Sequence, residues 1–95
     1  MKGVIILKIT KQASAGTMES SDVYVEIEPN NKGLDIHIES VVEKQFGDKI
    51  EACVRDVLNE YGLTDANVRI VDRGALECVL RARVETAVLR CGGDK

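Results

Sequence analysis

The feature that most constrains the fold is a change of hydrophobic period along the chain. Apolar and polar side chains alternate in residues 23–28 and again in residues 34–39, which is typical of strands with one solvent-facing side. From about residue 42 to residue 61 the apolar side chains instead recur every three or four positions, as on one face of a helix. Residues 66–72 return to a strand pattern, and residues 74–90 return to a helical one.

These patterns predict a two-layer α+β fold with the element order β-β-β-α-β-α, in which residues 13–18 pair as a short first strand with the strand after them. Each predicted helix has one apolar face, so both are expected on one face of a mostly antiparallel sheet of four or five strands. The 95 residues predict a single domain. Residues 1–8 are expected to be an extension or a further strand, and residues 91–95 a loose tail.

Local signals predict where the helices begin and end. Ser40 and Glu43 have the spacing of a capping box at the start of the first helix. Gly62 suits the position after that helix ends. Asp72 is placed to cap the second helix. The expected apolar side of the second helix consists of Leu76, Val79, Leu80, Val84, Ala87 and Val88.

The charged residues do not predict a nucleic-acid or membrane protein. The net charge is -3 and the basic residues form no block, whereas phosphate binding needs a concentrated basic face. The apolar run at residues 4–7 is too short for a membrane span or an export signal, so we expect a cytoplasmic protein. Arg81 and Arg83 do not share a helical face, and we expect them to be solvated or, for Arg81, paired with Glu77 or Glu85.

The cysteines and the single histidine predict no metal site and no catalytic centre. Cys53, Cys78 and Cys91 form no CxxC pair; we expect the first two to be partly buried in helices and the third to lie in the tail. His37 falls on the polar side of its strand, where a solvated role is expected. The chain also has no GxSxG elbow, phosphate loop or dinucleotide-binding glycine motif, so it is not expected to act as an enzyme by itself.

The most distinctive polar stretch lies between the first two predicted strands, where residues 19–22 read Glu-Ser-Ser-Asp. Serine and aspartate favour turns because their side chains bond nearby backbone groups. The stretch therefore predicts the tip of a hairpin that presents one or two hydroxyl groups. From these residues alone, Ser20 is most simply a turn residue.

Three blocks of the sequence resemble the acyl carrier protein of citrate lyase, its gamma subunit. They are residues 15–23 (AGTMESSDV), residues 42–48 (VEKQFGD) and residues 72–83 (DRGALECVLRAR). The resemblance covers nearly the whole chain, from about residue 9 to about residue 90. Common carrier proteins are helical bundles with an Asp-Ser-Leu motif, which is absent from this chain. An arm attached here would sit on a β-turn instead.

The resemblance implies that Ser20 carries a phosphoribosyl-dephospho-coenzyme A group, joined through a phosphodiester by a prosthetic-group transferase. In that family the arm ends in a thiol that bears an acetyl group. The alpha subunit exchanges acetyl for citryl with release of acetate, and the beta subunit cleaves the citryl thioester to oxaloacetate. The family often has glycine after the modified serine, whereas this chain has Ser21, which could compete for the arm or stiffen the turn.

An alternative of another class is an unmodified α+β interaction or assembly module, which would bind partner chains and carry no adduct. The two hypotheses differ in the mass of the peptide that contains Ser20. The acidic residues beside it, Glu19 and Asp22, are open to two interpretations at this point. They either steer a basic partner surface or simply form the turn.

Overall fold

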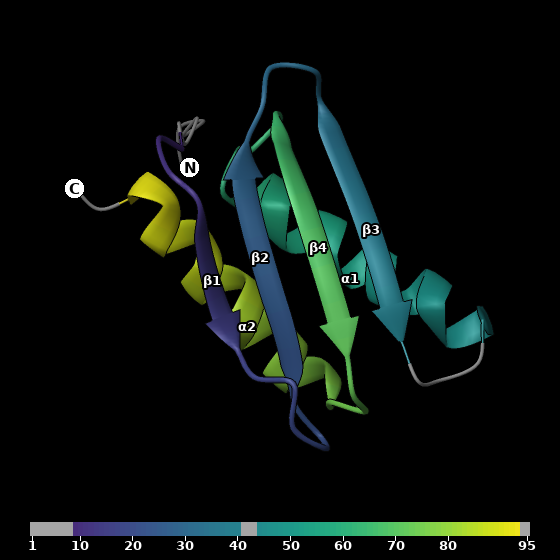
Figure 1. Ribbon diagram of the computed structural model, residues 1–95. Helices are drawn as coiled ribbons and strands as arrows, with labels where there is room; N and C mark the ends of the chain where they lie inside the picture. The colour runs from purple at the N-terminus through teal and green to yellow at the C-terminus, as the bar shows by residue number, and fades with distance from the viewer. Residues whose placement is uncertain (1–8, 41–43, 94–95) are drawn as a thin grey trace.

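The computed structural model describes residues 9–40 and 44–93, which form a four-stranded sheet and two helices (Figure 1). The elements in chain order are β1 (Ala13–Gly16), β2 (Val23–Pro29), β3 (Leu34–Ser40), α1 (Lys44–Glu60), β4 (Ala66–Asp72), α2 (Glu77–Val88) and a short helical turn, η1 (Leu89–Gly93). The predicted α+β class and the order β-β-β-α-β-α are confirmed. The predicted extension at residues 1–8 lies outside the described residues.

The strands lie in the order β1-β2-β4-β3. β1 pairs with β2 and β2 with β4 in antiparallel fashion, while β3 pairs with β4 in parallel. The parallel pair follows from the connection, because α1 carries the chain from the end of β3 back to the start of β4. β2 and β3 are consecutive in sequence but are separated in the sheet by β4.

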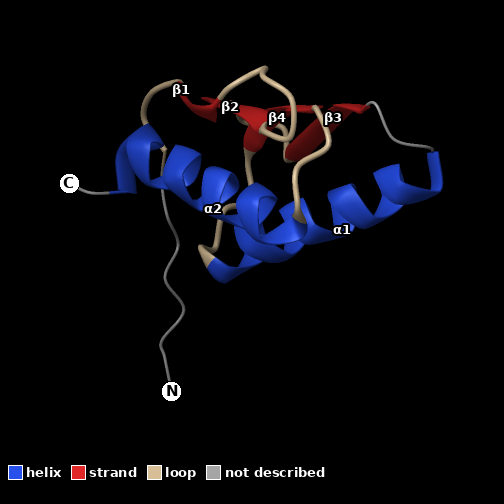
Figure 2. Ribbon diagram, turned by 90° about the horizontal axis from the view of Figure 1, so that it is seen from below, coloured by secondary structure: helices blue, strands red, loops and turns tan. Residues whose placement is uncertain are grey.

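Both helices cover the same face of the sheet, as predicted (Figure 2). The alternating apolar side chains of β2 and β4 point to that face, and Val23, Val25, Ile27 and Ile70 are fully buried there. The helical contribution to the same core consists of Cys53, Val54, Val57, Leu58, Leu80, Val84, Ala87 and Val88. The other face is open to solvent, and His37 is exposed on it, as expected.

The end of α1 is built as the sequence predicts. The N–H of Leu63 donates to the carbonyl of Leu58 at 3.0 Å, and Gly62 between them has a φ of 69°. A left-handed glycine with such a bond closes the last helical turn. The capping box at the start of α1 includes Glu43, which lies outside the described residues.

The predicted cap of α2 is wrong. Asp72 ends β4, and its carboxylate accepts the N–H of Ala75 at 3.1 Å and the Ser40 hydroxyl at 2.9 Å. It therefore shapes the β4–α2 connection and ties it to β3. The helix begins after Leu76, which has no side-chain cap and is 71% exposed. Leu76 is thus outside the core because it precedes the helix whose apolar side it was expected to join.

Two cysteines are placed differently from the prediction. Cys91 is fully buried in η1, where its carbonyl accepts the N–H groups of Thr10 at 3.0 Å and Lys11 at 3.1 Å. Cys91 therefore belongs to the packed core and not to a loose tail, whereas residues 94–95 of the predicted tail lie outside the described residues. Cys78, in contrast, is exposed on α2, while Cys53 is buried.

Arg81 links the two helices instead of pairing along its own. Its guanidinium lies 3.0 Å from Asp56 and 3.0 Å from Glu60, both on α1. The predicted partners Glu77 and Glu85 are one turn away on α2, but the packing of the two helices brings α1 carboxylates closer. Neither described helix is long and apolar enough to cross a membrane.

Candidate attachment site

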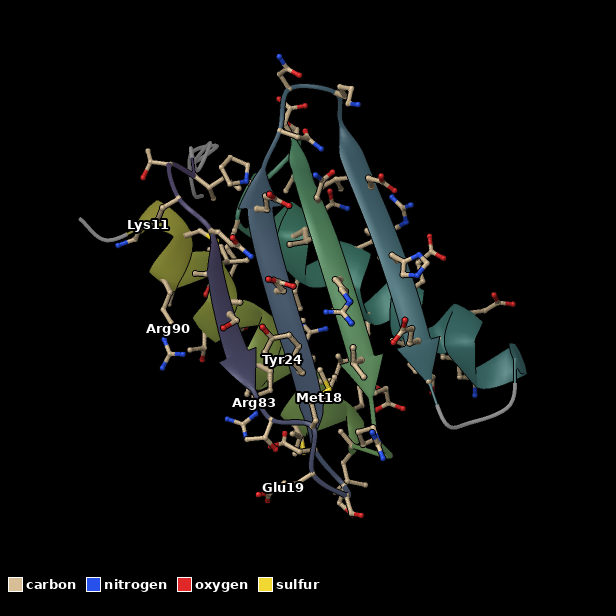
Figure 3. All side chains as sticks on the ribbon, viewed as in Figure 1. Lys11, Met18, Glu19, Tyr24, Arg83 and Arg90 are labelled. Atoms are coloured by element: carbon tan, nitrogen blue, oxygen red, sulfur yellow. The ribbon has the colours of Figure 1, made fainter. Side chains whose placement is uncertain are left out.

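Ser20 lies in the turn of the β1–β2 connection. Figure 1 shows this connection at the end of the sheet drawn lowest. Its side chain is exposed, and so are those of the neighbouring Glu19 and Ser21. Figure 3 shows Glu19 projecting away from the sheet at this tip. The hydroxyl of Ser20 is therefore on the surface, where a modifying enzyme can reach it.

The tip is a tight turn with Ser20 and Ser21 at its centre. The N–H of Asp22 donates to the carbonyl of Glu19 at 3.1 Å, which closes a four-residue turn. Ser21 has a φ of 67° and is the only non-glycine residue with a positive φ among the described residues. A positive φ at the third position only is the pattern of a type II turn, which favours glycine there. The serine at this position therefore holds a strained backbone.

Replacing Ser21 with glycine is expected to stabilise the protein. Glycine adopts the left-handed region without the Cβ clash, although it also increases the entropy of the unfolded chain. We expect a net gain of about 0.5 kcal/mol in the free energy of unfolding and a rise of about 2–4 °C in melting temperature. Ser20→Gly is the matched control, because Ser20 does not have a positive φ. Ser20→Gly should therefore lower the stability slightly, and a Ser21→Gly change that is equally or more destabilising would contradict the strain at Ser21.

The turn is held by the carboxylate of Asp22. Its oxygens accept hydrogen bonds from the Val23 N–H at 2.7 Å and the Thr17 hydroxyl at 2.8 Å. The guanidinium of Arg83 on α2 adds two more, from Nε at 3.0 Å and from Nη2 at 2.9 Å. A bidentate arginine–carboxylate pair fixes orientation as well as distance. Asp22 therefore joins both ends of the connection to the helix layer.

These donors hold the pKa of Asp22 at about 2, well below its usual range. The hydrogen bond from Arg83 is the largest cause, followed by those from the Val23 N–H and the Thr17 hydroxyl. The negative charge of Asp22 is therefore neutralised within the molecule. Glu19 and Asp22 were open to two interpretations, steering of a basic partner or formation of the turn. Turn formation fits Asp22, whereas Glu19 is the exposed acid beside Ser20.

The Asp22 cluster is expected to make the domain sensitive to acid. The pKa of Asp22 is depressed in the folded state. The stabilisation that its ionised carboxylate gives is therefore complete above the ordinary aspartate pKa of about 4. It is lost as the pH falls through the folded value of about 2. The melting temperature of Asp22→Asn should therefore lie below that of the native chain by a constant amount from pH 7 to about pH 5. The difference should shrink below about pH 4; a difference independent of pH down to about 2 would contradict this role.

The backbone of the turn is also fastened to β4. The N–H of Ser21 donates to the carbonyl of Arg73 at 2.9 Å, and the N–H of Arg73 donates to the carbonyl of Asp22 at 3.0 Å. These two bonds extend the β2–β4 pairing beyond its last register pair, Val23 with Asp72. The two serine hydroxyls are thus presented from a turn supported by strand β4 and helix α2.

Gly16 allows the connection to start where it does. It ends β1 with a φ of +89°, and a Cβ built on it would lie 1.8 Å from the carbonyl oxygen of Val23 and 3.2 Å from Cδ of Arg83. Only glycine permits this approach. From the sequence, Gly16 is expected to weaken a strand or mark a bulge; the structure shows that it lets β1 and the Arg83 side chain close on the turn.

Arg83 and Thr17 are the residues of this site that sequence reasoning missed. Both lie in blocks that carry the family resemblance, residues 72–83 and residues 15–23. Because both blocks resemble the same family, the sequence offered one indication that residues 15–23 and residues 72–83 contact each other in the fold. The described residues contain no group of three or more His, Cys, Asp and Glu side chains that could hold a metal ion.

Comparisons with known proteins identify the family of the chain. A family model described as ACP, malonate decarboxylase delta subunit (MdcD), matches residues 10–91. The citrate lyase acyl carrier protein of Haemophilus influenzae (strain PittEE) is 58% identical over 88% of this chain and 87% of its own. The acyl carrier protein of Albidiferax ferrireducens is 51% identical over 93% of this chain and 91% of its own. That of Oenococcus oeni is 48% identical over 88% of this chain and 87% of its own.

A solved structure has the same fold. One chain of a Pseudomonas malonate decarboxylase hetero-tetramer in complex with malonate superposes with a TM-score of 0.78, covering 95% of this chain and 93% of that one, at 22% identity. At this identity the likeness concerns the fold alone. The sequence relatives are much more similar and are matched over nearly their full length. On their identity and coverage, the chain belongs to the citrate lyase acyl carrier protein family.

Proposed function

We propose that this chain is the acyl carrier subunit of a citrate lyase and that Ser20 is the attachment point of its phosphoribosyl-dephospho-coenzyme A arm. The observation that carries the proposal is the exposed hydroxyl on a turn fastened from both sides. An open tip fits a large covalent group, since nothing in the described structure has to move to admit it. When bound, the arm supplies a thiol that forms thioesters with acetyl and citryl groups.

Attachment requires a base, which we expect the transferase to supply. The serine oxygen must lose its proton and bond to the phosphorus of an activated phosphoribosyl donor, from which a phosphate-containing group departs. The single histidine of the chain, His37, is on β3, and two strands separate it from β1. The transferase would therefore deprotonate Ser20, while the chain contributes an accessible and rigidly presented oxygen.

The braced turn also suits delivery of the arm to two active sites. A tether raises the effective concentration of its end at every site within reach. The bonds of Arg73 and Arg83 to Ser21 and Asp22 hold the turn from which the tether would leave the domain. The exposed Glu19 next to the attachment point favours partners with a basic rim around their entrance. The proposed partners are the alpha and beta subunits and the prosthetic-group transferase, in the cytoplasm.

Co-production of the chain with the transferase and its donor-forming enzyme tests this function. We expect one added arm in the intact mass and, once the arm is acetylated, cleavage of citrate to acetate and oxaloacetate when alpha and beta subunits are present. The same mixture with unmodified chain should be inactive. If the unmodified chain binds the subunits and supports full cleavage, the chain is an assembly module and the carrier proposal is wrong.

A further inference from the structure

A cleft of about 200 Å³ lies between the two helices at the end of β4. Its apolar lining comes from Ile50 and Cys53 on α1, from Ala75 in the β4–α2 connection and from Leu80 on α2. The proposed function leaves this cleft unexplained. It combines an apolar lining with a place beside the attachment site.

The cleft and the turn lie on two sides of one short connection. Asp72 lines the cleft, and the next residue, Arg73, makes both backbone hydrogen bonds to the turn through Ser21 and Asp22. Figures 1 and 2 show the β1–β2 connection and the start of α2 at the same end of the domain. An arm on Ser20 therefore has only the residues of the β4–α2 connection to pass before its free end reaches the cleft.

The size of the cleft selects which part of the arm can enter. Sites that enclose drug-sized ligands measure roughly 300–1,000 Å³. A cleft of about 200 Å³ is too small for a nucleotide but has room for a thioester and a short acyl group. Its apolar walls would remove water from that end of the arm.

The charges of the lining favour a neutral occupant. The cleft carries the carboxylates of Asp72 and Glu77 against the single ammonium group of Lys49. Asp72 is 4% exposed, and both of its oxygens already accept hydrogen bonds from the protein. An acetyl thioester has no charge, whereas a citryl thioester keeps ionised carboxylates that this lining repels.

We propose that the α1–α2 cleft shelters the acetyl-thioester end of the Ser20 arm between reactions and excludes the citryl form. The proposal rests on the proposed function, because it requires an arm on Ser20. The acetyl thioester would then be shielded from water while the carrier waits for citrate. Exchange to citryl would keep the arm outside the cleft, available to the next active site.

Disulfide trapping tests where the end of the arm lies. The deacetylated arm ends in a thiol, and Cys53 lines the cleft with a side chain that is 7% exposed. Burial is the main cause that raises the pKa of the Cys53 thiol, so it should react slowly with reagents from solution. Diamide takes two protons and two electrons from a pair of thiols and leaves one disulfide. We expect it to join the arm to Cys53 within the holo-protein.

Cys78 is a competitor within the same chain. It is exposed on the first turn of α2, so an arm moving freely in solution should bond to Cys78 in preference to the buried Cys53. Peptide mapping by mass spectrometry distinguishes the two products. Predominant bonding to Cys53, abolished by Cys53→Ala and kept by Cys78→Ala, supports docking. Predominant bonding to Cys78 or to a second molecule overturns it.

A matched pair of variants tests protection of the thioester. Ala75→Leu fills the cleft, while Ala82→Leu adds the same atoms at an exposed position on α2. We expect hydroxylamine to cleave the acetyl thioester at least about threefold faster in Ala75→Leu and at the native rate in Ala82→Leu. Equal rates of thioester cleavage in the native chain, Ala75→Leu and Ala82→Leu, all three folded, would overturn the inference. An absent arm in the intact mass would instead refute the function on which it rests.

Discussion

Replacing Gly16 with alanine should cost about 4 kcal/mol or more of folding free energy and lower the melting temperature by more than about 15 °C. The new Cβ would stand 1.8 Å from the carbonyl oxygen of Val23, and this is a backbone atom that cannot rotate away. β1 would have to separate from β2, and the φ of +89° adds the strain of a left-handed residue. Urea and thermal denaturation followed by circular dichroism measure both quantities.

Gly33→Ala separates the clash from the strain. Gly33 has a similar φ of +97°, but nothing lies within 4 Å of the Cβ position. Its replacement should cost only the backbone term, about 1–2 kcal/mol. If the two alanine variants are equally stable, the close approach of β1 to Val23 is not important and our description of the site is wrong.

Ser20→Ala is expected to abolish attachment of the arm without disturbing the fold. The side chain is exposed, so the change in unfolding free energy should stay within about 0.5 kcal/mol. After co-production with the transferase, the intact mass should be that of the unmodified chain. The reason is chemical, because alanine has no oxygen to bond to phosphorus.

Ser21→Ala is the control for the neighbouring hydroxyl. Ser21 is also exposed, but its N–H donates to the carbonyl of Arg73, and it occupies the other central position of the turn with a φ of 67°. We expect this variant to gain the full mass of the arm. Loss of the arm in Ser21→Ala together with its retention in Ser20→Ala would move the attachment point by one residue.

The layers of the fold could be predicted from the sequence because they depend on local periodicity. The alternation in residues 23–28 identifies the buried face of β2, and the repeat in residues 42–61 identifies the apolar side of α1. The position of β4 between β2 and β3 could not be predicted in the same way. Strand neighbours depend on pairing between distant segments, and each alternating strand is compatible with several partners.

The turn could also be predicted, but its support could not. Residues 19–22 have turn-forming side chains, so their place at the tip follows from composition. The partner of Asp22 is Arg83, which is 61 positions away and is one of two arginines on α2. The helical period of α2 does not indicate which of Arg81 and Arg83 reaches the β1–β2 turn. The placements of Leu76 and Cys91 failed for a related reason, since both lie at helix ends, where periodicity gives least information.

The most direct test of the central claim is the mass of the peptide containing Ser20, isolated from the organism in which the chain is made beside its modifying enzymes. The account predicts an added phosphoribosyl-dephospho-coenzyme A, with fragment ions placing the phosphodiester on Ser20 and not on Ser21. An unmodified peptide from an actively citrate-cleaving complex, or an arm on any other residue, would contradict it.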